Sequence, residues 1–456
     1  MTRRRDHDTA RPRPEAPPAV ARPALGRRRV LVGASAAAAA LLAACGGAAG
    51  DTADDPSGDV VEDVELRMTW WGDEARHEAT VAAIELFEER NPGVAITPEF
   101  SGFDGYFDRL ATQTAGGNAP DLIQMDFRFL TEYASREALL DLSPYVGEQL
   151  DTSGLAGSVA ESGAVDGTLY AVPLGVTALS VIVDAGDLGE SGVERPDDDT
   201  WTWEDLAAVA AEVPQAREGD YWGVVDAGGQ EPAFEAFLIQ RGKALFDGAA
   251  LGFSEEDLLA WWELWEGMRA ADAAPPPDVS SADQNTAETS GLTTDQAAML
   301  IGLSSRYGGF AAANPTPLEL LRIPGDVDRS GTYLKPSMFL SGAAGTEHPE
   351  VVAEFIDFMI NDPEAVEVLG IQRGIPAVDE ARVAVSADLP AEEVATVEFI
   401  DALGDDVAPT PSAPPPGAGE VVDLFMRVTQ EVAFGQVSPE EAAARFFAEA
   451  PGLVGS

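Results

Sequence analysis

The sequence predicts an α/β fold with a mostly parallel sheet, because strand-like and helix-like segments alternate along the chain. Apolar and polar residues alternate over residues 64–71, a segment that ends at Gly72 and is typical of a strand. Residues 94–100 and 119–126 are two further predicted strands, and a helix is predicted over 106–115. A second series of strands and helices begins near 179–183.

Helix-capping residues mark where several helices begin. Asp73 is a candidate N-cap for the helix that follows the first strand, and Asn91-Pro92-Gly93 ends that helix. Thr202 is an N-cap candidate before Trp203, which we expect to be a structural residue. Further helices are predicted near 254–271, near 350–360, from 363 onward and over about 438–449.

Charge and composition exclude several classes of protein. The chain has 456 residues, of which 45% are apolar, so a large core is expected. Asp and Glu number 79 against 28 Lys and Arg, which gives a net charge of −51. Phosphate recognition needs a basic face, so we expect no nucleic-acid partner. We expect the acidic residues to be mostly solvated.

The metal-ligating and disulfide-forming residues are few. Cys45 is the one cysteine, which excludes an intrachain disulfide. The three histidines cannot form a Cys/His metal cluster, and we expect His77 and His348 on the surface. No cofactor is predicted, although an all-carboxylate calcium site stays open.

The first 44 residues have the features of a signal peptide. A basic segment that contains Arg27-Arg28-Arg29 precedes a short apolar stretch, which is too short for a transmembrane helix. Leu42-Ala43-Ala44-Cys45 resembles a lipobox, after which the cysteine is acylated and anchors the protein to a membrane. The arginines before Val30 resemble a twin-arginine export signal. Residues 45–62 are then the lipidated cysteine and a flexible tether.

No catalytic constellation stands out in the sequence, whereas the ends of two strands suggest a binding site. There is no nucleophile elbow, phosphate loop or dinucleotide fingerprint in a suitable context. Trp71 and Asp73 follow the first strand, and Met125, Asp126 and Arg128 follow the third, where open α/β sheets place ligands. Aromatic faces beside a few polar groups suit a sugar. Alternation sends Trp70 and Trp71 to opposite faces, so one is expected in the core and the other near the rim.

A set of short segments in a fixed order resembles a known family. These segments are Trp71-Gly72-Asp73, Ala115–Asp121, Leu169–Pro173, Thr202–Asp205, Ala297–Met299, Pro349-Glu350, Phe355–Phe358 and Arg373–Pro376. In this order, behind a lipobox, they resemble the extracellular solute-binding proteins of ABC importers. The resemblance is to the branch with the maltose-binding proteins, and within it to the lipid-anchored carbohydrate binders of high-GC Gram-positive bacteria.

The resemblance implies two α/β lobes joined by a hinge, with the ligand in the cleft between them. One lobe would comprise residues 63–177 and 336–380, and the other 178–335 and 381–456. The ligand contacts implied by the family's motif positions are Trp71, Asp73, Arg76, Met125, Asp126, Arg128, Thr177, Ser304, Ser305, Arg306, Phe339 and Arg373. The chain departs from the family pattern at the crossing, with Thr177 and Val183, and at Ser304-Ser305-Arg306.

The function that follows is that of a monomeric, non-enzymatic receptor on the outer face of the cell membrane. It would bind a mono- or oligosaccharide and deliver it to the transmembrane subunits of an ABC permease. Two alternatives stay open. One is a secreted carbohydrate-active enzyme, which needs a carboxylate pair aimed at one glycosidic bond. The other keeps the fold but changes the solute to a peptide, a polyamine or a metal complex.

Overall fold

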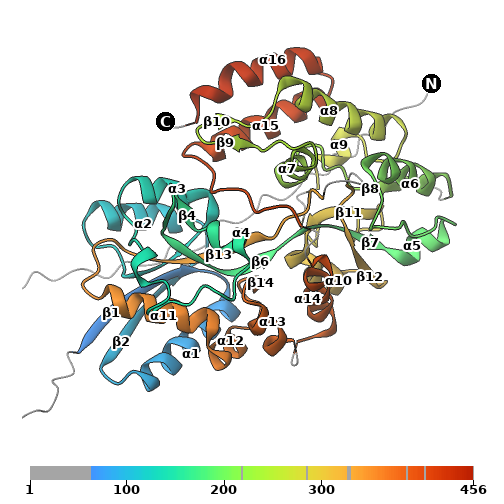
Figure 1. Ribbon diagram of the computed structural model, residues 1–456. Helices are drawn as coiled ribbons and strands as arrows, with labels where there is room; N and C mark the ends of the chain where they lie inside the picture. Colours follow the sequence, from blue (N-terminus) through green and yellow to red (C-terminus); the bar gives the residue numbers. More distant parts are fainter. Residues whose placement is uncertain are drawn as a thin grey trace, which may run out of the picture. The chain divides into compact units, whose positions relative to one another are not determined.

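The computed structural model describes residues 63–216, 219–283, 286–325, 330–386, 389–404 and 407–454. The predicted signal peptide, Cys45 and the tether to residue 62 lie outside the described residues. The described chain is built around two separate β-sheets with helices packed on their faces (Figure 1). The fold is therefore mixed α/β, as the sequence predicts.

The first sheet has six strands in the order β14-β6-β13-β3-β1-β2. Its strands are β1 (Val64–Trp71), β2 (Val94–Ser101), β3 (Leu122–Met125), β6 (Ala171–Thr177), β13 (Lys335–Gly342) and β14 (Ile375–Pro376). Strand β1 lies between β2 and β3 and is parallel to both. The predicted strand at 119–126 is shorter than expected, because Pro120 precedes it and Asp126 already caps the next helix.

The prediction of a mostly parallel sheet is wrong. Strand β13 is antiparallel to both β3 and β6, and β14 is antiparallel to β6. The reason is that β6 leaves this sheet towards the second sheet, whereas β13 returns from it, so the two strands run in opposite directions. Only the part of the sheet built from consecutive βα units is parallel.

The second sheet has four strands in the order β12-β7-β11-β8. These are β7 (Leu179–Asp184), β8 (Trp222–Val224), β11 (Ala297–Leu303) and β12 (Leu318–Arg322). Strand β11 is parallel to β8 and antiparallel to β7, and β12 is antiparallel to β7. Two short hairpins complete the strands, β4 (Ala164–Val165) with β5 (Thr168–Leu169), and β9 (Phe246–Asp247) with β10 (Ala250–Leu251).

Helices cover both faces of the six-stranded sheet (Figure 1). On one face lie α1 (Glu74–Arg90), α11 (Pro349–Asn361) and α12 (Pro363–Leu369), whose apolar residues form a core with Leu66, Met68 and Trp70. On the other face, α2 (Tyr106–Ala115) and α3 (Phe127–Ser135) pack against Trp71, Ile123 and Met125. Shorter elements of this region are η1 (Ser143–Tyr145), α4 (Gly157–Glu161) and α13 (Asp379–Val385).

The largest apolar cluster lies on one face of the second sheet. It gathers residues of α5 (Ala185–Glu190), α6 (Trp203–Ala216), α7 (Glu231–Gln240), α8 (Glu255–Ala270), α15 (Ala418–Ala433) and α16 (Pro439–Glu449). Trp203 packs edge-to-face on Trp261 and donates a 2.7 Å hydrogen bond to Gln240, which confirms its structural role. The remaining elements are α9 (Pro277–Ser280), η2 (Ser304–Arg306), α10 (Tyr307–Ala313), α14 (Ala391–Leu403) and η3 (Ala450–Gly452).

Local sequence signals locate several helix ends correctly. Asp73 accepts a hydrogen bond from the Arg76 backbone N–H as the N-cap of α1. Thr202 and Asp205 exchange hydrogen bonds in front of α6. The Asp205 N–H donates to Thr202 Oγ1 at 3.2 Å, and the Thr202 N–H donates to Asp205 Oδ2 at 2.9 Å.

His77 is wrongly predicted as a plain surface residue, because it is half-buried, accepts a hydrogen bond from Trp70 and stacks on Phe100. Among the described residues, no helix is both long and apolar enough to cross a membrane.

Candidate functional site

The carboxyl ends of several strands meet at one edge of the six-stranded sheet. Strands β1, β2, β3 and β6 all run in the same direction and end there. Strands β13 and β14 run the opposite way and therefore begin there. This edge gathers the loops that follow Trp71, Ser101 and Met125, together with Thr177 and Lys335.

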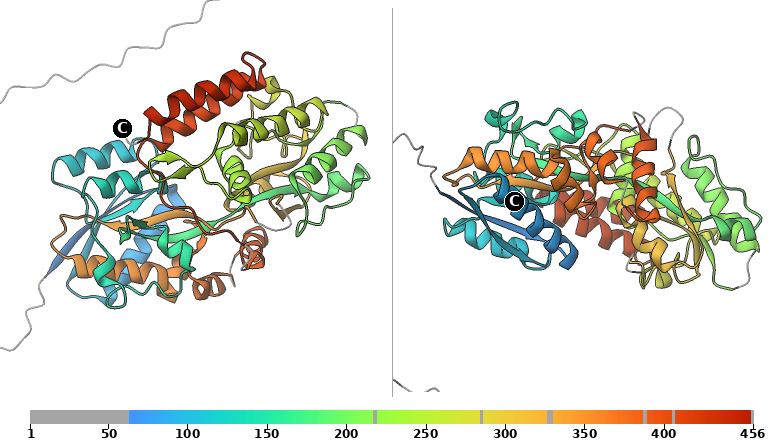
Figure 2. Two further views of the ribbon diagram at one scale, coloured as in Figure 1. Left: turned by 45° about the horizontal axis from the view of Figure 1, so that its top comes forward. Right: turned by 90° about the horizontal axis from the view of Figure 1, so that it is seen from below.

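The second sheet adds a matching edge. Strands β8 and β11 are parallel, so Val225 and Ser304 leave the sheet on the same side, where β7 begins. Only Ala178 separates the end of β6 from the start of β7, so the two edges meet at this residue. We call the residues at this junction the crossing edge: 72–76, 101–103, 126–128, 177–179, 304–306, 333–337 and 372–374. Two stretches of chain join the sheets: β6 passes directly into β7, and a segment from the second sheet leads into β13. Both can be followed in Figure 2.

Three hydroxyl-bearing residues tie the first crossing to η2. The Thr177 and Ser304 hydroxyls lie 3.2 Å apart, and Ser304 Oγ also accepts from the Ala178 N–H at 3.2 Å. The Ser305 N–H donates to Thr177 Oγ1 at 3.1 Å. Thr177 and Ser304 are fully buried, whereas the Ser305 side chain is exposed. Thr177 and Ser304 therefore fix the crossing, and Ser305 is the one of the three that solvent reaches.

The second crossing contains a buried charged triad. Tyr333 donates a short hydrogen bond to Glu235 of α7, and Lys335 Nζ lies 3.2 Å from the Tyr333 hydroxyl and 3.8 Å from Glu235 Oε2. Burial raises the pKa of Glu235, while Lys335 opposes this shift. The pKa of Lys335 is also raised, because burial is outweighed by Tyr333, Glu231 and Glu235. The triad links the start of β13 to α7.

The turn after β1 is shaped by Gly72 and Arg76. A Cβ at position 72 would lie 2.6 Å from the Arg76 Cδ, so the arginine side chain occupies the space that glycine leaves. Arg76 Nε donates to the Gln372 carbonyl at 2.8 Å, and Nη1 donates to the Trp71 carbonyl at 3.3 Å. The Asp73 side chain is exposed beside this pair. The structure thus brings Asp73 and Arg76 together at the crossing edge.

The two tryptophans at the end of β1 pack on opposite faces, but neither lies at an open rim. Trp70 is fully buried, and Trp71 is 6% exposed. The Trp71 ring is enclosed edge-on by Phe103 and Tyr106, with ring centroids at 5.5 and 5.0 Å. Phe103 is 41% exposed, so the aromatic surface that solvent reaches here belongs to Phe103.

The loop after β3 presents an ion pair beside this aromatic ring. Asp126 caps α3 and accepts from Arg128 Nε at 3.0 Å. The Arg128 guanidinium is more than half exposed and lies 5.6 Å from the Phe103 ring centroid. The hydrogen bond to Asp126 raises the pKa of Arg128, and the charge of Glu231 on α7 adds to this effect. Glu231 belongs to the second sheet's helices, so charges from both sheets interact at the crossing edge.

Arg373 is buried next to Gln372, whose carbonyl accepts from Arg76. It is 4% exposed, donates to Gln124 Oε1 at 3.0 Å and to Thr80 Oγ1 at 2.6 Å, and its Nη1 has no hydrogen-bond partner. Burial, together with the charge of Arg76, lowers the pKa of Arg373 to about 9. A cation without a carboxylate in its first shell is an expensive group to bury.

Arg306 is the remaining arginine predicted for the site. It is half-buried and lies over the Phe310 ring at 5.4 Å. Burial lowers the pKa of Arg306, while the nearby Asp283 raises it. No hydrogen bond or ion pair of this guanidinium exists within the described parts of the chain.

The twelve predicted contact residues fall into two groups by burial. The structure buries Trp71, Met125, Thr177, Ser304, Phe339 and Arg373. It leaves exposed or half-buried Asp73, Arg76, Asp126, Arg128, Ser305 and Arg306. The buried group packs beneath the crossing edge, and the second group supplies its polar surface. The second group is therefore the part of the predicted set that solvent reaches.

Sequence reasoning missed three residues of this edge, Phe103, Tyr333 and Gln372. It also missed Glu231 of α7, whose charge acts on Arg128. Phe103 had a usable signal, because Ser101-Gly102-Phe103 leaves β2 at the same end at which β1 and β3 finish. Glu231, Tyr333 and Gln372 carried no such signal, since only tertiary contacts bring them to this part of the molecule.

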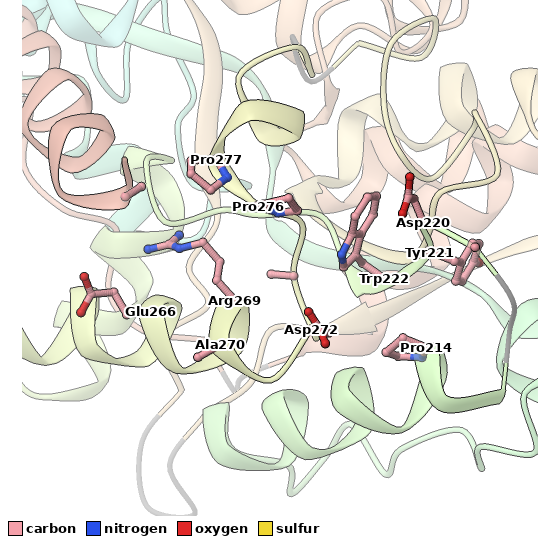
Figure 3. Close-up of a pocket in the computed structure, with 13 residues that line it drawn as sticks. Pro214, Asp220, Tyr221, Trp222, Glu266, Arg269, Ala270, Asp272, Pro276 and Pro277 are labelled. Carbon is pink, nitrogen blue, oxygen red and sulfur yellow. The ribbon is translucent and has the colours of Figure 1, made fainter. Parts of the chain in front are cut away.

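A separate hollow of about 750 Å³ lies among the helices of the second sheet. Trp222, Arg269, Asp272 and Pro276 line it (Figure 3). Arg269 lies in a buried salt bridge of 2.7 Å with Asp226. None of the twelve predicted contact residues lines this hollow.

In the described ranges, no group of three or more His, Cys, Asp or Glu side chains is arranged to hold a metal ion.

Comparison with protein families gives one match that covers most of the described chain. The model of the bacterial extracellular solute-binding protein family matches residues 71–366. This range runs from the last residue of β1 into α12 and contains eleven of the twelve predicted contact residues, all except Arg373.

Solved structures show the same fold. An extracellular solute-binding protein family 1 member from Alicyclobacillus acidocaldarius is 29% identical, with a TM-score of 0.73 over 86% of this chain and 98% of its own. A periplasmic oligogalacturonide-binding protein from Yersinia enterocolitica, in complex with saturated digalacturonic acid, is 26% identical. Its TM-score is 0.70, over 85% of this chain and 98% of its own.

Curated relatives match over a shorter stretch. A protein of Brucella abortus described as a binding protein is 23% identical over 139 residues. This match spans 30% of the chain and about a third, 33%, of the relative.

Proposed function

We propose, because the chain belongs to the family of bacterial extracellular solute-binding proteins, that it captures a carbohydrate outside the cell and delivers it to an ABC transporter permease. The fold is that of the two-lobe periplasmic binding proteins. The ligand would lie at the crossing edge, where the two sheets meet. The proposal further specifies the class of solute, the conformational change that holds it, and the absence of a reaction on it.

The observation that most favours a carbohydrate is an exposed aromatic ring beside charged hydrogen-bonding groups. Phe103 is 41% exposed, and the Arg128 guanidinium lies over its ring. A sugar presents C–H groups on one face and hydroxyls around its rim, so a ring can cover the face while Asp73 and Arg128 bind hydroxyls. The oligogalacturonide-binding neighbour supports the same class of solute.

The mechanism that we propose is hinge closure. The lobes would comprise residues 63–177 with 336–380, and 178–335 with 381–456. Their crossings would be at 177–180 and 335–337. A ligand that contacts both lobes favours the closed conformation by its differential affinity for that state. Asp73, Arg76 and Arg128 would supply contacts from one lobe, and Ser305 and Arg306 from the other.

The place of the protein in the cell is part of the proposal. The family is extracellular, and the lipobox at Leu42–Cys45 favours a lipid anchor on the outer face of the cell membrane. The twin-arginine-like segment favours export in the folded state. The receptor would act as a monomer beside the permease subunits.

Thermal-shift screening against a carbohydrate panel tests the class of solute. A ligand that binds only the folded state stabilises it by about 2.7 kcal/mol at one hundred times its Kd. We expect one group of related saccharides to raise the melting temperature. If peptides or polyamines raise it and saccharides do not, the same fold serves another solute.

A second measurement separates the receptor from a secreted carbohydrate-active enzyme. The protein is incubated with its tightest saccharide, and the products are followed by mass spectrometry. We expect the saccharide to stay intact. A cleavage product that grows with time and protein concentration would replace the receptor by the enzyme.

A further inference from the structure

The arginines of the protein divide sharply by their partners. Acidic residues outnumber basic ones 79 to 28, so a carboxylate is available almost everywhere. Eleven of the fifteen described arginines lie in a salt bridge with one. The four that do not are Arg76, Arg109, Arg306 and Arg373. Three of these four belong to the crossing edge.

Arg76 and Arg373 form a pair of like charges held by neutral groups. Arg76 uses two of its five N–H groups on backbone carbonyls. Arg373 bonds an amide and a hydroxyl and leaves Nη1 unpartnered, although it is 4% exposed. The nearest carboxylate to this pair is Asp73, which accepts from the Arg76 backbone N–H, while Arg76 and Asp73 make no ion pair. The two adjacent guanidinium groups therefore make hydrogen bonds to neutral acceptors and none to a carboxylate among the described residues.

Arg306 lies on the other side of the same junction. The loop 372–374 packs on the end of β6, because a Cβ at Gly374 would lie 3.1 Å from the Val176 carbonyl. The next residue of β6, Thr177, accepts from the Ser305 N–H, and Arg306 follows directly. The charge of Asp283 acts on Arg306, again without an ion pair between them. The segments that carry all three arginines are therefore linked through the end of β6.

Burial makes the charged forms of these three arginines less favourable, most strongly for Arg373, and an anion at the site would offset this cost. On the basis of the proposed carbohydrate-binding function, we propose that the solute is an acidic saccharide. Its carboxylate or sulfate would be bound by Arg76 and Arg306, and Arg373 would add its charge from behind Arg76. A guanidinium binds such groups through two parallel hydrogen bonds, which a neutral hydroxyl cannot match.

The test compares one saccharide with and without its charge. Calorimetric titrations of the purified protein use a galacturonate trimer, a glucuronate-containing oligosaccharide and the methyl esters of both, at low and at high salt. We expect an acidic oligomer to bind at least tenfold more tightly than its own methyl ester. High salt should remove most of this difference, because it screens the ionic part of binding.

Variants locate the effect. Arg306→Gln should reduce the preference for the acid to within about threefold, because the acid loses much more affinity than its methyl ester when the guanidinium is removed. Arg306→Lys, which keeps the charge, should retain part of the preference. Arg427→Gln on α15 is the control, since Arg427 is 59% exposed and outside the crossing edge.

Each outcome decides between the inference and the function on which it rests. Equal or tighter binding of the methyl esters, or binding confined to neutral saccharides of the panel, overturns the acidic solute and leaves the carbohydrate receptor in place. A preference for the acid that stays above about threefold in Arg306→Gln also overturns the assignment to this site. Failure of every acidic and neutral saccharide to bind rejects the proposed function itself.

Discussion

Asp73 combines a structural role with a proposed role in binding, and one substitution separates them. Its carboxylate accepts the Arg76 N–H at 3.0 Å as the N-cap of α1, yet the side chain is exposed at the crossing edge. Asparagine caps a helix as well as aspartate does, but it has no charge to offer two hydroxyls.

Asp73→Asn should therefore keep the melting temperature and weaken saccharide binding about tenfold, which corresponds to roughly 1.4 kcal/mol. Calorimetric titration and a melting curve of the same sample measure both quantities. Asp205→Asn is a matched control, because Asp205 is an exposed carboxylate in the first turn of α6, away from the edge. Unchanged affinity in Asp73→Asn would leave Asp73 with its capping role alone.

Cys45 carries the second prediction at the residue scale. It is the single cysteine and follows Leu42-Ala43-Ala44 behind a basic and then apolar segment. Cys45→Ala should release the protein from the membrane into the medium, because the proposed lipid anchor is attached to this cysteine. Fractionation followed by a salt wash measures the release. A variant that stays bound after the wash would contradict the lipid anchor.

At the scale of elements, the triad of Glu235, Tyr333 and Lys335 joins β13 to α7. The Lys335 side chain is 23% exposed and that of Glu235 is 9% exposed, so the pair is largely shielded from water. Removing one partner of such a pair leaves the other charge uncompensated, which costs more than the pair itself contributes.

Lys335→Met should destabilise the protein by about 2 kcal/mol at neutral pH. The pKa of Glu235 is raised above its usual value in the folded state, so the folded protein holds a proton that the unfolded chain has released. Stability from this group is therefore present below the ordinary glutamate pKa and falls as pH rises through the folded value. Without Lys335, the folded pKa rises further, and the loss of stability should grow from acid to neutral pH.

Urea unfolding of both proteins at several pH values measures this difference. Lys243→Met is the control, since Lys243 is exposed and is the only other lysine. A penalty that is the same at acid and neutral pH would mean that the ionisation of Glu235 is not what Lys335 compensates.

At the scale of the whole molecule, the two sheets are joined most directly where β6 passes into β7. Ala178 alone separates β6 from β7, and the Thr177–Ser304 contact fixes this point. A short, well-bonded junction lets two packed bodies rotate while each keeps its core.

Addition of the tightest saccharide should therefore reduce the radius of gyration, as measured by small-angle X-ray scattering. The reduction should follow the same saturation curve as calorimetric binding, because closure and binding are linked. Asp73→Asn should need more saccharide to reach the same compaction. Tight binding without any change in the radius of gyration would contradict hinge closure.

The sequence by itself determined the elements and many of their ends, because these depend on nearby residues. The period of apolar positions gave β1 (Val64–Trp71) and α2 (Tyr106–Ala115), and capping residues marked the starts of α1 and α6. The order of short motifs predicted the two-lobe fold, which the structural neighbours share. The elements and their caps depend on residues within a few turns of chain, whereas the motif order is read along the whole sequence.

Only the tertiary structure decided which predicted residues reach solvent at the crossing edge. Arg373 finds its partners 249 and 293 positions away in Gln124 and Thr80, and Lys335 reaches Glu235 from another element. Trp71 is covered by Phe103, so the exposed ring is one that the motif did not contain. The direction of β13 likewise depends on a return from the second sheet. Burial and pairing depend on contacts between distant residues, which local periodicity does not specify.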